Sequence, residues 1–494
     1  MSQEITPNPS DEHGIRLQKL ETWQNLGHDP FTPRAKTTRT HFSQDLIQIF
    51  TTDTEATVEA TVAGRIMLKR DFGKAAFGSI RDENGTIQVY FKKDILGDQV
   101  FEEYKLLDLG DIVSITGKMF LTQKGEPTLQ VTSFQILTKA LRPLPEKFHG
   151  LEDIETRYRK RYLDLISNTH IKESFIIRSK LIHTIRDTLS KQGFLEVETP
   201  MMHPIPGGAA AKPFITHHNS LGTDLYLRIA PELYLKRLVV GGMHKVFEIN
   251  RNFRNEGIDT THNPEFTMLE LYEAYSDWRG IVDLFINLVK TVALSINQST
   301  KLSYQGTEVD IAQWKEISYS DALKEKGVDP EKITTREQAL EIAKKHHLEI
   351  SKDMGKWGIL AVLFDHLIAD NIIEPTIVFD YPAEISPLSK RKPENPDLAE
   401  RFEAYAFGME ICNGFSELNN PLTQKQVFED QIIRKENGDE ETMGFDEDYI
   451  EALEQGLPPT GGIGIGIDRL TMIFIDSPSI RDVILFPTMK KIVQ

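Results

Sequence analysis

The segment from Val246 to Tyr275 constrains the fold most strongly, because it reads as two β-strands around a charged loop. A period of two puts polar side chains on one face of the first strand and aromatic and acidic side chains on one face of the second. These residues are Glu248, Asn250, Asn252 and Arg254 on the first strand, and Phe266, Met268, Glu270 and Tyr272 on the second. Such a mixture on two facing strands predicts a pocket for a phosphate-bearing ligand and a cation. The alternative is an exposed sheet with ordinary salt bridges.

The length and composition of the chain limit the class of protein. A chain of 494 residues implies two or three domains, and its hydrophobic (39%) and charged (27%) fractions are typical of a soluble globular protein. The single Cys412 excludes an internal disulfide framework and fits a reducing cytoplasm. A net charge of -17 argues against indiscriminate nucleic-acid binding but allows a local basic surface for one RNA. Residues 1–16 are polar, so we expect a disordered tail rather than a signal peptide, and we expect no membrane span.

Residues 17–140 are predicted to form an all-β module. From Ala56 to Thr138, five alternating segments separated by turn residues favour a five-stranded OB barrel. The dipeptide Asn84-Gly85 tolerates positive φ at both central positions and predicts a tight hairpin between the second and third strands.

The predicted barrel carries candidates for contact with a single-stranded nucleic acid. Phe77 and Gln88 are expected on the barrel face that such folds use for this purpose, with Arg70 just before them and Glu126 on a later hairpin. Stacking and hydrogen bonding to base edges would suit these side chains. The alternative for Phe77 is an ordinary core position.

A proline-broken, basic linker at residues 141–165 separates the barrel from a larger domain at 166–494. A helix from Phe175, stopped by Gly193, leads into a strand that ends at Pro200 and is typical of an interface. Residues 279–392 are mainly helical by pattern and are interpreted as scaffold or insertion.

The segment RFEAYAFGMEICNGFSELNN, which begins at Arg401, predicts a hairpin with its turn near Ala406 and Phe407. This turn would place Glu403 opposite Glu410, at a separation between Cβ atoms of about 5 Å. Two carboxylates at that distance repel each other unless a cation lies between them, and Mg²⁺ suits a site with few carboxylates. The alternatives are two exposed acids or a register slip that removes the pairing.

Further candidates for binding a cationic small molecule lie nearby. Asn413, Phe415 and Glu417 recur at every second position, so an extended run would aim all three side chains the same way. Glu232 follows Pro231 at a predicted helix start, where capping is the alternative role. The loop with Gly207-Gly208 allows a close approach of backbone to a ligand.

The segment GGIGIGIDRL matches a dinucleotide-binding fingerprint only weakly, because a βαβ context is missing. We expect Gly462, Gly464 and Gly466 to let a flat ligand lie against a strand, and Arg469 to reach a phosphate from the next helix. The alternatives are close strand-helix packing and a local ion pair between Asp468 and Arg469.

Several separate motifs together resemble the class II aminoacyl-tRNA synthetases, and specifically the bacterial lysyl-tRNA synthetases. The motifs that carry this resemblance are VAGRIMLKRDFGKAAFGSIRDENGTIQVY, ALRPLPEKFHGLEDIETRYRKRYLDLI, IPGGAAAKPFITHHNSLGTDLYLRIAPELYLKRLVVGG, FRNEG, EICNGFSELN and GIGIDRL. The sequence departs from the family at Tyr405-Ala406-Phe407-Gly408, where adjacent glycines are usual, and at Asn420, where an acid is usual.

The resemblance implies an α+β fold in which an OB anticodon-binding barrel precedes a catalytic domain with a six-stranded antiparallel sheet and flanking helices. It implies a cytoplasmic homodimer that uses ATP and up to three Mg²⁺ ions per subunit to join L-lysine to tRNA(Lys). The lysine carboxylate would attack the α-phosphate of ATP to give lysyl-adenylate, and the 3′ adenosine hydroxyl of the tRNA would then take the lysyl group.

The resemblance also implies roles for individual residues. The residues implied for catalysis are Arg254 and Arg469, and those for ATP are Arg254, Glu256, His262, Asn263, Phe266, Glu410 and Arg469. The residues implied for lysine are Gly208, Glu232, Arg254, Glu270, Tyr272, Asn413, Phe415 and Glu417. The residues implied for the anticodon are Arg70, Phe77, Gln88 and Glu126, and those for magnesium are Glu403 and Glu410.

Three other functions are compatible with parts of the sequence. An aspartyl- or asparaginyl-tRNA synthetase would share the fold and the ATP residues. Its substrate side chain is an anion or an amide, however, and would need a cationic or neutral pocket, not the two acids Glu270 and Glu417. An inactive RNA-binding paralogue could lose Arg254, Glu410 or Arg469, yet all three are present. A lysine ligase acting on a protein would typically lack the barrel.

Overall fold

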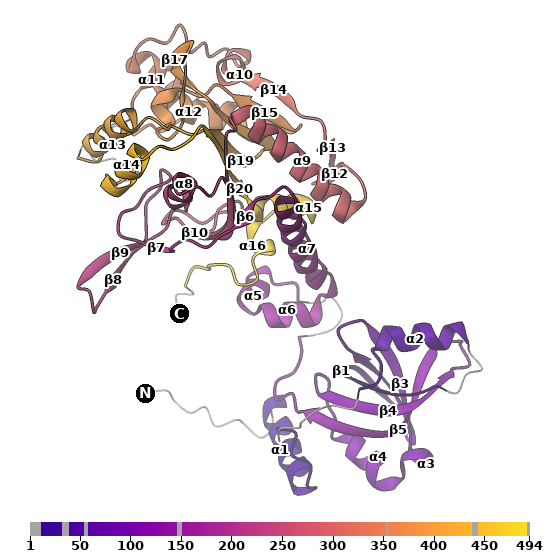
Figure 1. Ribbon diagram of the computed structural model, residues 1–494. Helices are drawn as coiled ribbons and strands as arrows, with labels where there is room; N and C mark the ends of the chain where they lie inside the picture. The colour runs from indigo at the N-terminus through magenta and orange to yellow at the C-terminus, as the bar shows by residue number, and fades with distance from the viewer. Residues whose placement is uncertain are drawn as a thin grey trace. The chain divides into compact units, whose positions relative to one another are not determined.

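The computed structural model describes residues 11–31, 39–53, 58–145, 151–351, 354–436 and 443–491 (Figure 1). The chain divides into two compact units, residues 1–152 and 153–494. The expected linker, residues 141–165, falls across this division. Its last part forms helices α5 (Ile154–Arg159) and α6 (Arg161–Ser167) within the second unit, while residues 146–150 lie outside the described residues.

The first unit is a closed five-stranded barrel with the strand order β1-β2-β3-β5-β4, as predicted. Its strands are β1 (Glu59–Asp71), β2 (Ala75–Arg81), β3 (Thr86–Lys92), β4 (Ile112–Leu121) and β5 (Pro127–Thr138). Its helices are α1 (Glu12–Asn25), α2 (Ser43–Thr52), α3 (Lys93–Leu96) and α4 (Asp98–Lys105). Alternate residues of the strands point inward to one apolar core, which explains the period of two in the sequence.

Two expectations about the first unit are wrong in detail. Residues 11–16 are not a disordered tail, because α1 begins at Glu12 and the buried Arg16 donates hydrogen bonds to backbone carbonyls of Leu109 and Ala140. Residues 1–10 lie outside the described residues. The hairpin between β2 and β3 has a four-residue loop without positive φ at Asn84 or Gly85. The carboxylate of Asp82 accepts hydrogen bonds from the backbone N–H groups of Asn84 and Gly85, and this contact replaces the expected tight turn.

The second unit is built on an eight-stranded sheet with the order β14-β15-β18-β19-β20-β11-β10-β6. These strands are β14 (Lys315–Ser318), β15 (Thr376–Phe379), β18 (Arg401–Ala406), β19 (Met409–Ser416), β20 (Thr460–Gly466), β11 (Glu265–Ala274), β10 (Lys245–Phe253) and β6 (Leu195–Glu196). The six strands from β15 to β10 are antiparallel, as predicted, and one parallel strand is added at each edge. The second unit therefore has the predicted α+β architecture with a wider, mixed sheet.

One face of this sheet is covered by helices that form the main apolar core. These helices are α7 (Thr169–Lys191), α9 (Trp278–Asn297), α15 (Ile467–Phe474) and α16 (Ile480–Val483). Helix α7 begins before the expected Phe175 and ends ahead of Gly193, whose φ is 85°. Among the described residues, α9 alone is long and apolar enough to cross a membrane, but its apolar residues pack against the sheet in this core.

The other face of the sheet carries the polar residues and is flanked by α8 (Glu232–Val240), α13 (Pro421–Glu436) and α14 (Glu447–Glu454). A separate three-stranded sheet consists of β7 (Met202–His203), β8 (Ile215–His218) and β9 (Thr223–Leu227).

The region 279–392 is less uniformly helical than its sequence pattern suggests. It contains α10 (Tyr319–Glu325), α11 (Arg336–Lys345), α12 (Lys356–Leu367), η1 (Ala369–Asn371), η2 (Ala383–Ile385), β12 (Lys301–Tyr304), β13 (Thr307–Asp310) and β16 (Arg391–Lys392), and β17 (Asn395–Ala399) follows it. In addition, β14 and β15 extend the main sheet. Part of the presumed insertion therefore belongs to the scaffold of the site.

Candidate active site

The strand register aligns polar residues in a row across the open face of the main sheet. Glu248 of β10 lies opposite Glu270 of β11, as the alternating pattern predicts. Glu270 lies opposite Gly464 of β20, which in turn lies opposite Asn413 of β19. The row ends at Glu403 of β18, which pairs with Asn413. This row forms the floor of a site.

Glycines in the central strand β20 make this floor hollow. A Cβ atom added to Gly464 would lie 2.3 Å from the Met268 side chain. A Cβ atom at Gly462 would lie 2.1 Å from a carboxylate oxygen of Glu417 and 2.6 Å from the Tyr272 ring. These two glycines therefore accommodate side chains of the protein itself, rather than only a flat ligand.

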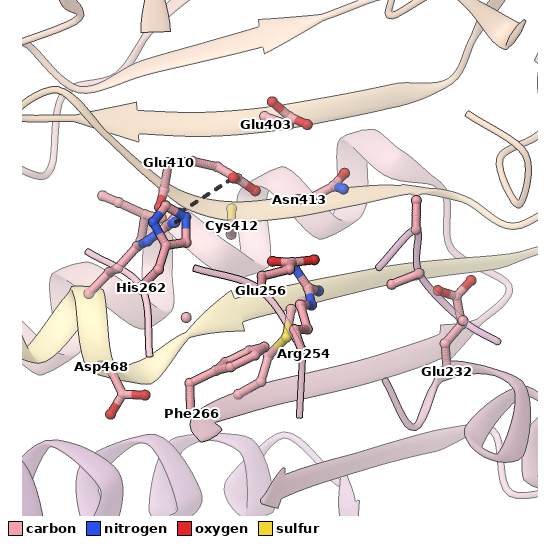
Figure 2. A pocket seen from close by; sticks show the side chains of 18 of the residues that line it. Glu232, Arg254, Glu256, His262, Phe266, Glu403, Glu410, Cys412, Asn413 and Asp468 are labelled. Carbon is pink, nitrogen blue, oxygen red and sulfur yellow. Dashed lines mark hydrogen bonds and ion pairs between the residues drawn. The ribbon is translucent and has the colours of Figure 1, made fainter. Parts of the chain in front are cut away.

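A cavity of about 420 Å³ opens above the floor (Figure 2). Most of the residues implied for ATP, lysine and magnesium line it: Gly208, Glu232, Arg254, Glu256, His262, Asn263, Phe266, Glu403, Glu410, Asn413, Phe415 and Arg469. The other three, Glu270, Tyr272 and Glu417, are buried next to the cavity and do not line it. The structure thus brings together residues from distant parts of the second unit, while the four candidate anticodon residues lie in the first unit.

Arg254 lies inside the cavity just beyond the end of β10. Its backbone N–H donates to the carbonyl of Pro264, and its guanidinium lies 5.2 Å from the centre of the Phe266 ring. Its Nε atom has no hydrogen-bond partner among the residues that the structure describes. Figure 2 shows the guanidinium beside Glu256 and below the strand that carries Asn413. An arginine with a free donor in a cavity is suited to bind phosphate or carboxylate oxygens.

Arg469, at the start of α15, is held by two neighbours. One guanidinium nitrogen donates to the backbone carbonyl of Glu410 at 3.0 Å, and another lies 3.0 Å from Nε2 of His262. Asp468 does not pair with Arg469, because it binds Arg178 of α7 at 2.7 Å and accepts a hydrogen bond from the backbone N–H of Thr267. The proposed local ion pair between Asp468 and Arg469 is therefore wrong.

The predicted pairing of Glu403 with Glu410 is also wrong. The turn lies at Phe407 and Gly408, both with positive φ, and a bulge at Ile411 shifts the register. Glu403 consequently faces Asn413, and Glu410 faces Tyr405. The bulge nevertheless returns Glu410 to the cavity side of β19, so both acids line the same cavity.

The two acids have different surroundings. Glu403 is buried, and its carboxylate accepts hydrogen bonds from Arg401 and from the hydroxyl groups of Tyr381 and Tyr405. Glu410 is 40% exposed, and its carboxylate lies 3.5 Å from Arg469. Desolvation and the charge of Glu403 raise the pKa of Glu410, against the effect of the nearby arginines. A cation would relieve this repulsion, so the pair fits a Mg²⁺ ion that takes few protein ligands and keeps water and phosphate oxygens.

A third acid lies near this pair. Burial, followed by the charges of Glu403 and Glu410, raises the pKa of Asp365 on α12 to about 7. Within the described ranges, no group of three His, Cys, Asp or Glu side chains has the geometry of a metal site.

Two buried acids contact one buried lysine beside the cavity, and a third buried acid, Glu270, lies near these two acids. Lys236 of α8 has no exposed surface, and its Nζ atom lies 2.5 Å from Oε1 of Glu232 and also contacts Oε2 of Glu417. Glu270 accepts a hydrogen bond of 3.0 Å from the hydroxyl of Tyr272. We refer to Glu232, Lys236, Glu270 and Glu417 as the acid cluster.

Burial dominates the electrostatics of the acid cluster. Desolvation raises the pKa values of Glu232 and Glu417, although the charge of Lys236 opposes this shift. Desolvation and the charge of Glu232 raise the pKa of Glu270 to about 8. Burial opposes the charged form of Lys236, but Glu232 and Glu417 together raise its pKa. The cluster therefore attracts a further cation.

Several residues of the site were missed from the sequence. Lys236 follows Glu232 by four residues, a spacing that places both on one helix face and would have indicated the pair. Arg401 precedes Glu403 by two residues, which places both on one strand face. The loop from Ile385 to Ser389 also lines the cavity, but no local pattern distinguishes it.

The outer face of the barrel carries the candidate anticodon residues. Arg70 pairs with Phe77, and Phe77 pairs with Tyr90, whose ring centre lies 4.6 Å from that of Phe77. Phe77 is absent from the barrel core, so the alternative core position is wrong. The side-chain amide of Gln88 donates to the hydroxyl of Thr128 at 2.8 Å, two residues from the exposed Glu126.

Comparisons with known proteins agree with this geometry. The family model for class II tRNA synthetases (D, K and N) matches residues 153–490, and that for the OB-fold nucleic acid binding domain matches residues 60–137. A lysine-tRNA ligase of Thermoanaerobacter pseudethanolicus is 52% identical over 478 residues, covering 96% of this chain and 95% of that protein. The lysine-tRNA ligase of Clostridium novyi is 53% identical over 480 residues (96% and 94% covered), and that of Bacillus subtilis is 50% identical over 489 residues (98% of each).

The chain therefore belongs to the class II tRNA synthetases of the D, K and N group, with an OB-fold domain before the catalytic domain. Within this group, the three bacterial relatives named above, which it matches over nearly their whole length, are lysine-tRNA ligases, and this confirms the predicted resemblance.

Proposed function

We propose that the chain attaches L-lysine to tRNA(Lys) in two ATP-dependent steps, through a lysyl-adenylate. The observation that carries this proposal is the acid cluster beside a cavity that also contains Arg254 and Arg469. A cluster that attracts a cation suits an amino acid with two ammonium groups. It does not suit aspartate or asparagine.

In the first step, the lysine carboxylate attacks the α-phosphate of ATP, and pyrophosphate leaves. Arg254 would hold the carboxylate and the α-phosphate together and stabilise the negative charge that develops between them, with Asn413 assisting at the carboxylate. Phe266 would stack on adenine, and Glu256, His262 and Asn263 would complete the nucleotide site. Arg469 would bind the γ-phosphate, since its guanidinium already lies at the cavity wall.

Glu403 and Glu410 would hold Mg²⁺ in this site. When bound, the ion neutralises phosphate charge. Glu410 is the more accessible of the two acids, whereas Glu403 already accepts hydrogen bonds from Arg401, Tyr381 and Tyr405.

The lysine substrate would be recognised at both of its amino groups. Glu232 and the carbonyl of Gly208 would bind the α-ammonium, and Glu270, Tyr272 and Glu417 would surround the ε-ammonium, with Phe415 beside the aliphatic chain. Oε2 of Glu417 contacts Lys236, but Oε1 has no hydrogen-bond donor among the described residues, which supports a donor from the substrate. Apolar analogues would leave these buried acids unpaired and would be rejected.

In the second step, the 3′ adenosine hydroxyl of tRNA takes the lysyl group. Arg70, Phe77, Gln88 and Glu126 would read a uridine-rich anticodon through stacking on Phe77 and hydrogen bonds to base edges. The position of Phe77 on the outer face of the barrel supports this role.

We propose that the protein acts as a cytoplasmic homodimer. The edge strand β6 and helix α7 expose large apolar side chains, including Leu195 (53%) and Ile176 (48%). Apolar surface on adjoining elements is typical of a subunit interface.

ATP–pyrophosphate exchange across all amino acids tests this function. We expect exchange that depends on lysine. Exchange that depends on aspartate or asparagine would show that the chain is an aspartyl- or asparaginyl-tRNA synthetase instead. No exchange with any amino acid would support an inactive paralogue.

A further inference from the structure

Lys236 is an unexpected feature of a site that would bind a doubly charged amine. Its ammonium group is fully buried and contacts Glu232 and Glu417, the two acids that would bind the α- and ε-ammonium groups of the substrate. By Coulomb's law, a fixed cation at this position repels both ammonium groups. Because this repulsion would weaken lysine binding, Lys236 should have another role that outweighs it.

The charge balance of the acid cluster indicates that role. Glu232, Glu270 and Glu417 carry three negative charges when ionised. The positive charge of Lys236 reduces the net charge of the cluster to minus two. This net charge matches the two ammonium groups of lysine. In the empty site without Lys236, three buried carboxylates would lie together with no cation among them, and the cluster would hold one more proton until lysine binds.

The contacts of Lys236 also hold the two acids in place. One oxygen of Glu232 and one of Glu417 are directed toward the same ammonium, and the ring of Phe415 lies 5.4 Å from it. The titratable and charged groups that act on the cluster from around it are Arg228, Glu248 of β10, Arg254, Tyr272 of β11, Arg401 of β18 and Tyr449 of α14.

We infer that Lys236 is a positioning residue for lysine recognition: it is an internal counter-ion that keeps Glu232 and Glu417 ionised and oriented toward a substrate with two ammonium groups. This inference rests on the proposed function. Lys236 does not contact the reacting atoms. It acts through the two acids.

The sign of one mutational effect tests the inference. Lys236→Met removes the cation and preserves the side-chain length. If Lys236 only repelled the substrate, this variant would bind lysine more tightly. If it positions the acids, the dissociation constant for L-lysine, measured by calorimetry on the full chain, should rise about tenfold or more. In ATP–pyrophosphate exchange, KM for lysine should rise while kcat changes little.

Proton release gives a readout that a purely structural role would not change. At neutral pH the Met variant should hold an additional proton in its acid cluster, so lysine binding should release about one proton more than in the original protein. Titrations in two buffers with different ionisation enthalpies measure this difference.

Lys139 provides a matched control. It is also fully buried and bonded to two carboxylates, Asp108 and Asp111, but it lies in the barrel. Lys139→Met should leave lysine binding and its proton release unchanged. If the Lys236→Met protein does not fold, Lys236→Gln retains a polar donor and carries the same expectation.

An unchanged or lower dissociation constant for lysine in a folded Lys236 variant would overturn the inference, as would unchanged proton release. If the original protein fails to bind lysine, the proposed function fails instead, so the two failures are distinguishable.

Discussion

The two units of the protein each contain a fully buried lysine between two carboxylates, but the two clusters differ in hydrogen bonding. In the barrel, Lys139 donates to Asp108 and Asp111, and the backbone N–H groups of Asp108 and Ala140 supply further hydrogen bonds to Asp111. In the second unit, one oxygen of Glu417 contacts Lys236, and the other has no hydrogen-bond partner among the residues that the structure describes.

This difference separates a structural cluster from a binding site. A buried carboxylate whose hydrogen bonds are complete holds local structure together and has no remaining capacity for a ligand. A buried carboxylate with one oxygen left without a donor lowers stability, and a ligand that supplies the missing donor is bound favourably. The comparison predicts that mutations in the two clusters will affect different properties.

The largest effect on stability is expected for Lys139→Met. Removing one partner of a buried, fully bonded ion pair costs about 3–5 kcal/mol, because two carboxylates lose their counter-ion. The midpoint of urea unfolding should fall for the barrel, whereas lysine-dependent pyrophosphate exchange should not change. A variant of unaltered stability would show that the barrel cluster is not structural.

The largest effect on activity is expected for Glu417→Gln. This change should lower kcat/KM for lysine in pyrophosphate exchange by roughly a hundredfold or more, because the ε-ammonium loses a buried ionic partner. Unfolding stability should fall less than for Lys139→Met, since Lys236 keeps its hydrogen bond to Glu232. Unchanged exchange would refute the assignment of Glu417 to the substrate.

A smaller effect is expected for Phe77→Ala. This variant tests whether the barrel binds tRNA through its outer face rather than through the ionic cluster around Lys139. Loss of one stacked base should raise KM for tRNA in aminoacylation by roughly 5- to 100-fold. Pyrophosphate exchange needs no tRNA and serves as the control. An unchanged KM for tRNA would remove Phe77 from the recognition surface.

The pH dependence of lysine binding should show the smallest effect. Because the pKa of Glu270 is raised to about 8, this carboxyl is protonated in the empty site at neutral pH and must lose its proton to bind an ammonium group. Lysine binding should therefore strengthen as pH rises from 6 to 8, by at most about tenfold per pH unit.

Glu270→Gln provides the control for this pH profile and should flatten it. Because the unfolded chain ionises Glu270 near its ordinary pKa of 4.5 while the folded protein keeps it protonated up to about pH 8, the raised pKa lowers folding stability increasingly as pH rises between these values. A KM for lysine that is independent of pH in the original protein would contradict the assignment.

Local patterns determined much of the fold. Alternation predicted the five barrel strands and the facing residues of β10 and β11, because the side-chain period of a strand depends only on the backbone. The six antiparallel strands of the catalytic sheet followed from the family resemblance.

Other features depended on contacts between distant segments. The bulge at Ile411, which directs Glu410 into the cavity, depends on the pairing of β18 with β19, and the turn residues do not reveal it. The loop between β2 and β3 is organised by the carboxylate of Asp82, which overrides the preference of Asn84-Gly85. Similarly, β6 and β14 join the sheet edges through pairings that no local pattern marks.

The sequence by itself determined which side chains share a strand or helix face, and it marked Arg254, Glu270 and Glu417 as candidates, whereas their place in one site followed from the family resemblance. Only the tertiary structure decided that Glu232, Glu270 and Glu417 converge, and that Lys236 lies among them. The physical reason is that periodicity is a local property of the backbone, whereas the burial and pairing of charges depend on which elements the fold brings together.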